Sequence, residues 1–312
     1  MKKLFIFSAI AALTLCGCQI QDPEITEVPE QNAVFTAAIA DGFENAATRT
    51  SLDSKGNVRW KTGDQVSIFY NGWTNYQYQV TDASDGKTIA GLNPVSQEST
   101  SGTSSSSSSL PSFTGGTVEE INNNVAFYSY SSAIELAKNG TAYLLDGVQL
   151  PATQEYAEGS FGNGSFPMAA VSNSTTDMNL KFKNVLGGLK LQLTGAARVA
   201  SISVKGNANE PLCGSANVTV STTSTPAIEL TDATATTVTL NCGTEGVQLD
   251  PETATAFIIA LPPVTMANGF TVTVTDTYGQ TMEIKSEKDP DHNPLQSPRY
   301  AVSKLHRHCR RL

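Results

Sequence analysis

The stretch Phe270-Thr271-Val272-Thr273-Val274-Thr275 alternates strictly between apolar side chains and threonines. Successive side chains of a β-strand point to opposite faces, so this period of two predicts a strand with one buried face and one wet face. Residues 256–261 are instead apolar at every position, which predicts a strand that is buried on both faces. The same alternation recurs along the chain at residues 35–39, 66–70, 189–194, 201–204 and 218–220.

The rest of the chain agrees with an all-β protein. After residue 18 no segment has a sustained helical period, apart from a turn or two of helix that we expect around Ala133 to Lys138. Charged residues make up only 16% of the 312 residues, and many short strands are separated by turn signals. This pattern predicts β-sandwiches, and the length is sufficient for two domains.

The first eighteen residues predict export. Lys2 and Lys3 precede an apolar run from Leu4 to Leu15, which is too short to span a bilayer and is typical of a secretory signal. The segment ends in Leu15-Cys16-Gly17-Cys18 and resembles a bacterial lipobox, with small Gly17 before Cys18. This resemblance implies cleavage before Cys18, lipidation of its thiol and attachment to a membrane outside the cytoplasm. The alternative is an ordinary signal peptide with incidental cysteines.

Composition divides the chain into four parts. We expect a signal peptide over residues 1–18, an N-terminal domain over 19–178, a C-terminal domain over 179–286 and a basic, proline-containing tail over 287–312. Residues 99–112 are rich in serine, bury almost nothing and are expected to form a solvated loop within the first domain. The tail is expected to be disordered, and its abrupt change in charge suggests a shifted reading frame or a truncated native end. Sequencing the gene tests that hypothesis.

The net charge restricts the possible partners, and the cysteines restrict the possible disulfides. The net charge is −9, although residues 285–312 hold seven Lys or Arg against three Asp or Glu. The body is therefore more acidic than the whole chain, which argues against nucleic acid as a partner. Cys213 and Cys242 are candidates for a disulfide in an oxidising compartment, but their spacing does not show whether their Cα atoms come within reach.

Residues that carry out catalysis are scarce. All three histidines, His292, His306 and His308, lie in the tail, so neither predicted domain has a histidine general base. The chain lacks a Gly-x-Ser-x-Gly elbow and recognised metal or phosphate-binding spacings. We therefore expect no enzyme and no cofactor. Catalysis by carboxylates alone stays open, since none of the 29 acidic residues stands out as a pair.

Several motifs occur in a fixed order over residues 33–284. They are Val34-Phe35-Thr36-Ala37-Ala38-Ile39, Thr48-Arg49-Thr50-Ser51-Leu52-Asp53, residues 58–69 (VRWKTGDQVSIF), Leu150-Pro151-Ala152-Thr153-Gln154, residues 156–161 (YAEGSF), residues 182–195 (FKNVLGGLKLQLTG) and residues 257–263 (FIIALPP). In this order, and behind a lipobox, they resemble the fimbrillin-like family, the lipoprotein precursors of type V pili in Bacteroidales.

The resemblance implies a fold and a route of assembly. It implies two tandem β-sandwich domains of the transthyretin-like, Greek-key type. An arginine-specific protease would cut between Arg49 and Thr50, which would free the body from the lipid on Cys18. The first strand, within residues 33–44, would then leave a groove that a strand of another pilus subunit fills. The alternative is that Arg49 lies on an ordinary surface loop.

A binding module of another class stays open. Trp73, Tyr76 and Tyr78 cluster in the sequence and could stack on sugar rings in a surface lipoprotein that captures glycans. The same aromatic residues also suit packing between strands. The tail, if native, lacks a convincing donor strand, which favours an accessory or tip subunit that accepts a strand without donating one. A hydrolase is the third and least favoured class.

Overall fold

The computed structural model describes residues 34–39, 51–52, 58–70, 72–95, 121–232 and 235–286. The predicted signal peptide, the serine-rich loop and the basic tail lie outside these residues. Within them the protein is all-β, with a single 3₁₀ turn, η1 (Asp82–Ser84), and no α-helix. No helix in the described part of the chain is long and apolar enough to cross a membrane.

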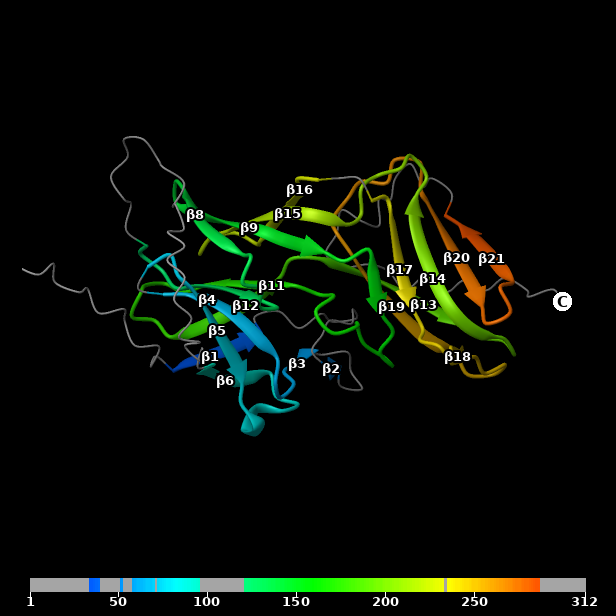
Figure 1. Cartoon of the computed structure of the whole chain (residues 1–312), viewed down its shortest axis with the longest axis horizontal. Coiled ribbons are helices and arrows are strands. Elements are labelled where there is room, and N and C mark those ends of the chain that lie inside the picture. The colour runs from blue at the N-terminus through cyan, green and yellow to red at the C-terminus, as the bar shows by residue number, and fades with distance from the viewer. Residues whose placement is uncertain are drawn as a thin grey trace, which may run out of the picture. The chain divides into compact units, whose positions relative to one another are not determined.

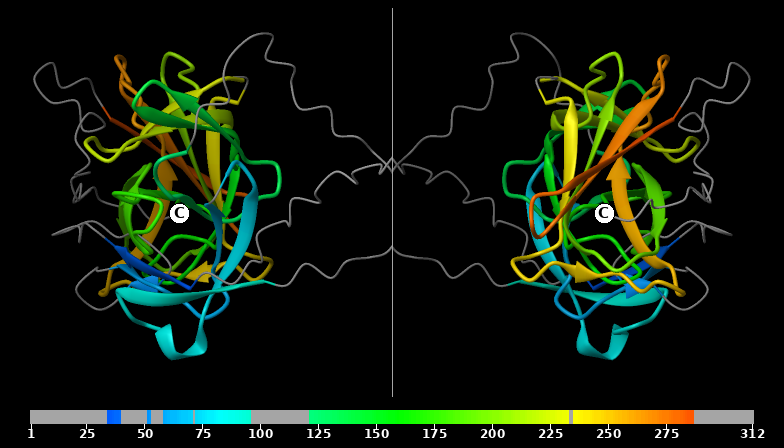
Figure 2. Two further views of the ribbon diagram at one scale, coloured as in Figure 1. Left: turned by 90° about the vertical axis from the view of Figure 1, so that its left-hand side faces the viewer. Right: turned by 90° about the vertical axis from the view of Figure 1, so that its right-hand side faces the viewer.

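Seven strands close into a barrel (Figure 1). The first strand completes it, because it pairs in parallel with one neighbour and antiparallel with the other. In the turned views this strand, in blue, lies next to a cyan strand (Figure 2). In order around the barrel the strands are β1 (Phe35–Ile39), β12 (Asn179–Asn184), β11 (Met168–Val171), β7 (Val125–Tyr128), β4 (Gln65–Phe69), β5 (Asn75–Val80) and β6 (Ile89–Pro94).

Alternation in the sequence decides which side chains fill the barrel. On β4, Val66 and Ile68 point inward, as the period of two requires. Aromatic rings form much of this interior: Trp60 packs edge-on against Tyr128 at 5.7 Å and against Phe182 at 5.3 Å between ring centroids. Edge-to-face pairs of this kind add about 0.5–1.5 kcal/mol each to the free energy gained by burial.

Three further sheets surround a second apolar core. The largest contains β10 (Thr153–Glu155), β17 (Thr237–Asn241), β14 (Arg198–Gly206), β20 (Phe270–Asp276) and β21 (Thr281–Lys285), with β18 (Val247–Gln248) paired to β14. A second sheet runs in the order β16 (Ala227–Leu230), β15 (Gly214–Val220), β9 (Ala142–Leu150) and β8 (Glu135–Asn139). The third pairs β13 (Gly187–Leu193) with β19 (Thr255–Leu261). A short ladder joins β2 (Ser51–Leu52) to β3 (Val58–Arg59).

The predicted strands that fall on described residues are confirmed. The alternating segments form β1, β4, β13, β14, β15 and β20, and residues 256–261 lie in the buried strand β19. The helical turn expected around Ala133 to Lys138 is wrong, because residues 135–139 form β8 and pair antiparallel with β9. Leu136 is buried there between the exposed Glu135 and Ala137, which fits a strand with one wet face.

Closure of the first sheet into a barrel was not predicted from the strand pattern. The division into two tandem Greek-key sandwiches with a boundary near residue 178 stays a prediction. Four strand pairings cross that position: β12 pairs with β1 and with β11, β9 pairs with β15, and β10 pairs with β17.

Candidate functional site: the slot of the first strand

The candidate site is the place that β1 occupies between β6 and β12, which we call the β1 slot. Both edges of β1 are bonded. On one side the backbone N–H of Thr36 donates to the carbonyl oxygen of Met178 at 3.0 Å. On the other side the backbone N–H of Ile39 donates to the carbonyl oxygen of Thr88 at 3.2 Å. Without β1, both neighbouring strands would present open backbone groups to another strand.

The inner face of β1 is part of the barrel core. Phe35 and Ala37 have no exposed surface, and Ile39 is partly buried against the same cluster. The ring of Phe35 packs edge-on against Tyr70 and Tyr78, at 5.4 and 5.3 Å between centroids. Full burial of an apolar side chain contributes about 1.5–3 kcal/mol, so the slot would be strongly apolar if it were empty.

Tyr78 has an unusual environment on the floor of this slot. Burial raises the pKa of its phenol above the ordinary value, and the neighbouring phenols of Tyr70 and Tyr76 act in the same direction. An ordinary tyrosine phenol is already neutral at physiological pH, and burial keeps the phenol of Tyr78 neutral at higher pH as well. A neutral ring is the appropriate lining for an apolar side chain such as Phe35.

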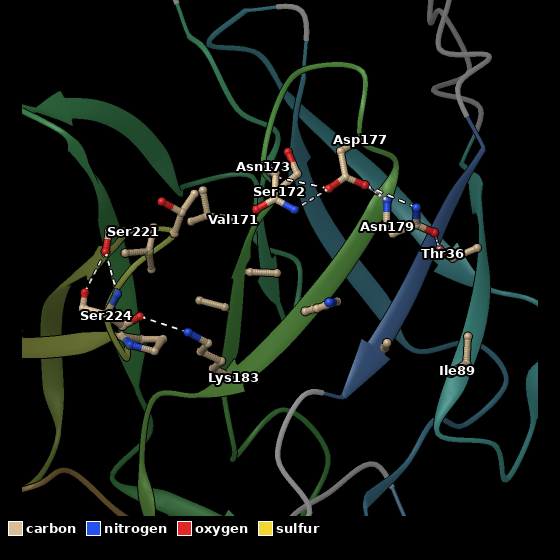
Figure 3. A pocket seen from close by; sticks show the side chains of 17 residues that line it. Thr36, Ile89, Val171, Ser172, Asn173, Asp177, Asn179, Lys183, Ser221 and Ser224 are labelled. Carbon is tan, nitrogen blue, oxygen red and sulfur yellow. Dashed lines mark hydrogen bonds between the residues drawn. The ribbon is translucent and has the colours of Figure 1, made fainter.

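The outer face of β1 is held by a polar chain of contacts (Figure 3). Thr36 Oγ1 donates to Asn179 Oδ1 at 2.6 Å, and Asn179 Nδ2 donates to Asp177 Oδ1 at 3.2 Å. The other carboxylate oxygen of Asp177 accepts from the backbone N–H and the side-chain amide of Asn173. The donation from the backbone N–H of Asn179, together with these other bonds, lowers the pKa of Asp177. The turn is thereby fixed with a negative charge at its centre.

A cavity of about 580 Å³ lies over this outer face. Some of its lining residues, including Thr36, Asn179 and Lys181, belong to barrel strands. Others, including Ser221, belong to the segment that follows β15. Lys183 also lines the cavity, and its Nζ donates a hydrogen bond to the carbonyl oxygen of Ser224 at 3.2 Å (Figure 3). The strand β1 therefore supplies side chains both to the apolar core and to a surface cavity.

The predicted processing residues are not described by the structure. Cys18, Arg49 and Thr50 lie outside the described residues, so lipidation and cleavage stay predictions. The described chain resumes directly after them at Ser51, where β2 pairs with β3.

The candidate disulfide between Cys213 and Cys242 is absent, because both residues are free, buried thiols. Topology explains the separation. Cys213 forms an isolated antiparallel bridge with Ala235, whereas Cys242 follows β17 at its far end. An extended strand rises about 3.3 Å per residue, so β17 alone spans roughly 13 Å. A disulfide needs Cα atoms within about 7 Å of each other.

The aromatic residues considered for glycan binding serve packing. Tyr78 is buried in the barrel, and Tyr76 packs against Tyr70 at 4.9 Å between ring centroids. Trp73 is partly buried against the second core. These three side chains do not form an open platform for a sugar.

Two groups of residues that position the slot and the core were missed by sequence reasoning. Asn179 and Asp177 follow a polar run, Ser172 to Thr176, that reads as an ordinary loop. Gln154 belongs to the motif Leu150-Pro151-Ala152-Thr153-Gln154. This motif contributes to the family resemblance, but it does not indicate what the side-chain amide of Gln154 does. In the structure this side chain is buried and bonds to Ala260.

The arrangement defines a β-rich protein with a barrel closed by its first described strand. No family model matches the chain, and no curated protein matches it either. Two solved structures are similar at low TM-scores. One is the tip fimbrial protein Mfa3 of Porphyromonas gingivalis with a C-terminal truncation, which is 10% identical to this chain with a TM-score of 0.28. The match covers 81% of this chain and 80% of the Mfa3 chain. A candidate adhesin of Bacteroides ovatus is 9% identical with a TM-score of 0.28, over 89% and 88% of the two chains.

Proposed function

We propose that this protein is a structural subunit, or an accessory or tip adhesin, of a type V pilus on the outer membrane and cell surface. It is exported as a lipoprotein through Cys18 and cut between Arg49 and Thr50 by an arginine-specific protease. It then assembles by accepting a strand of another pilus subunit in the β1 slot. In this role it needs no cofactor and catalyses no reaction.

The observation that carries the proposal is the position of β1. It is a short strand at the start of the described chain, it is bonded on both edges, and it places Phe35 and Ala37 in the barrel core. A strand with these properties supports exchange for two reasons. Its loss leaves apolar surface and two open ladders, and a strand supplied by a partner covers both again.

Limited proteolysis tests this function. The full chain is treated with an arginine-specific protease, and its intact mass and its elution in gel filtration are followed. We expect a fragment ending at Arg49 to be released and the remaining body to form larger assemblies. Arg49→Lys is the matched control, because it keeps the positive charge and removes the cleavage site. Cleavage that leaves the body monomeric with β1 still bound would contradict the proposal.

A further inference from the structure

The β1 slot distinguishes three consecutive positions of the strand that fills it. Resting on the proposed function, we propose that the slot selects a partner strand with an aromatic residue, then serine or threonine, then alanine or glycine. These correspond to the positions of Phe35, Thr36 and Ala37. The donor is a strand of a different subunit rather than the tail of a second copy of this chain.

The first position requires an aromatic ring. Phe35 lies between Tyr70 and Tyr78 with edge-to-face geometry at both contacts, and it is completely buried. A smaller side chain would leave a cavity lined by these rings, and deletions of this size cost about 3–5 kcal/mol in protein cores.

The third position requires a small side chain. Ala37 is paired with Leu180 of β12 on one side and with Ala90 of β6 on the other, and it has no exposed surface. It belongs to the same closed cluster as Trp60 and Phe182. Protein interiors are close-packed, so added methylene groups at this position force the neighbouring rings out of place.

The second position favours a hydroxyl donor, through a hydrogen bond at the exposed rim of the slot. The amide group of Asn179 donates to the carboxylate of Asp177, which only accepts, and this bond fixes the orientation of the Asn179 side chain. Its Oδ1 therefore faces β1 as an acceptor, and Thr36 Oγ1 supplies the proton at 2.6 Å. The backbone N–H of Thr36 is already used by Met178, so the side chain has to be the donor.

Together these positions fix the register. A slip of one residue would bring the polar side chain into the barrel and turn the aromatic ring outward. A slip of two residues would place the ring where only Ala37 fits. The slot thus accepts one alignment of a matching strand.

The tail of this chain does not match the pattern. Its strand-like segment reads Tyr300-Ala301-Val302, with alanine where the hydroxyl is needed and valine where the small residue is needed. The tail of a second copy would therefore satisfy only the aromatic position. The partner is expected to be a different chain that carries all three.

A peptide-exchange experiment on the folded full chain tests the selection. The recognition sequence of a site-specific protease is inserted after Glu44, and the chain is cut after folding so that β1 stays in place without a covalent link. A fluorescent peptide with the sequence of residues 34–40 is added, and its uptake is followed by fluorescence anisotropy. The uncut protein is the control, and it should take up no peptide.

Altered peptides then probe each position. We expect a Phe35→Ala peptide to bind at least a hundredfold more weakly, an Ala37→Phe peptide at least tenfold more weakly, and a Thr36→Val peptide about three- to tenfold more weakly. The loss for the Thr36→Val peptide should vanish on an Asn179→Ala protein, because the acceptor is then missing. A peptide of residues 299–305 should bind more weakly than that of residues 34–40.

The outcomes separate the two proposals. If the cut protein exchanges no peptide at all, strand exchange fails and the selection fails with it. If it takes up the parent peptide and the altered peptides equally, the selection is wrong while strand exchange stands. If the peptide of residues 299–305 binds as well as the parent, the tail of a second copy is a sufficient donor and the inference about a different subunit is overturned.

Discussion

The side chain of Gln154 bonds to both backbone groups of Ala260. Its Nε2 donates to the carbonyl oxygen of Ala260 at 2.8 Å, and its Oε1 accepts from the N–H of Ala260 at 2.9 Å. Ala260 lies on β19, whose backbone pairs on one side with β13. On the other side of β19, the Gln154 amide bonds to the backbone as a neighbouring strand would. The Gln154 side chain is buried, with only 3% of the residue exposed.

Replacing Gln154 should therefore destabilise the second core. In Gln154→Ala the two backbone groups of Ala260 stay buried without partners, and each such group costs about 1–3 kcal/mol. We expect the free energy of unfolding in urea to fall by about 2–4 kcal/mol. Gln149→Ala is the matched control, since the side chain of Gln149 is exposed and its amide bonds the half-buried Ser215. Equal losses in the two variants would contradict the role assigned to Gln154.

The first strand should contribute strongly to stability while it stays attached. Phe35→Ala removes a fully buried ring from the barrel, and we expect a loss of about 3–5 kcal/mol. Val34 precedes it and is 64% exposed, so Val34→Ala should change stability by less than about 0.5 kcal/mol. Chemical denaturation of the full-length variants measures both. A stable Phe35→Ala protein would show that β1 is not an integral part of the barrel.

Much of the strand content could be predicted from the sequence, because alternation is a local property. Strands such as β20 and β13 show their buried faces directly in the spacing of Val272, Val274, Leu189 and Leu191. The segment around Leu136 was misjudged for a related reason. A short run with few apolar residues fits both periods, and pairing with β9 decides between them.

The site was harder to predict, because it depends on contacts between distant residues. Thr36 and Asn179 are 143 residues apart, and nothing local to either residue indicates that they bond. The parallel pairing of β1 with β12 brings them together. Similarly, the distance between Cys213 and Cys242 in the fold follows from the strand topology, and the number of residues between them in the sequence does not predict it.

The turn that holds Asn179 should respond to acid. The donated hydrogen bonds lower the pKa of Asp177 in the folded protein below its unfolded value of about 4. Its carboxylate therefore contributes stability above that pH, and the contribution is lost as the pH falls through the folded pKa. We expect Asp177→Asn to be less stable than the wild type at pH 7, with the difference shrinking below about pH 4.

Denaturation at several pH values measures this dependence. Asp232→Asn, at an exposed aspartate, is the control for the loss of one surface charge. A difference for Asp177→Asn that stays constant down to acid pH would show that the hydrogen bonds do not favour the charged form.

Gly147 should tolerate no side chain. It has a φ of +78°, and a Cβ at this position would collide with the backbone carbonyl of Ala133. It forms a bulge in β9, because the pairing with β15 shifts between Ala216 and Val218. We expect Gly147→Ala to lose at least about 1–3 kcal/mol in thermal or chemical unfolding. Gly140→Ala, which has a φ of +61° in open space, should lose less because it carries strain without the collision.

The buried thiols should be unreactive and unpaired in the folded protein. Burial, together with nearby Glu155, raises the pKa of Cys242 to about 11, and burial also raises that of Cys213. Because the thiolate is the reactive form, neither should react with a disulfide reagent at pH 8. We expect no reaction in a full chain with Cys16, Cys18 and Cys309 replaced by serine, and modification of both thiols after denaturation. Adding Tyr278→Cys, at a side chain that is 87% exposed, supplies a site that should react at once. An intact mass lower by two hydrogens, with no thiols titrated after denaturation, would show instead that Cys213 and Cys242 are joined and that β17 pairs differently.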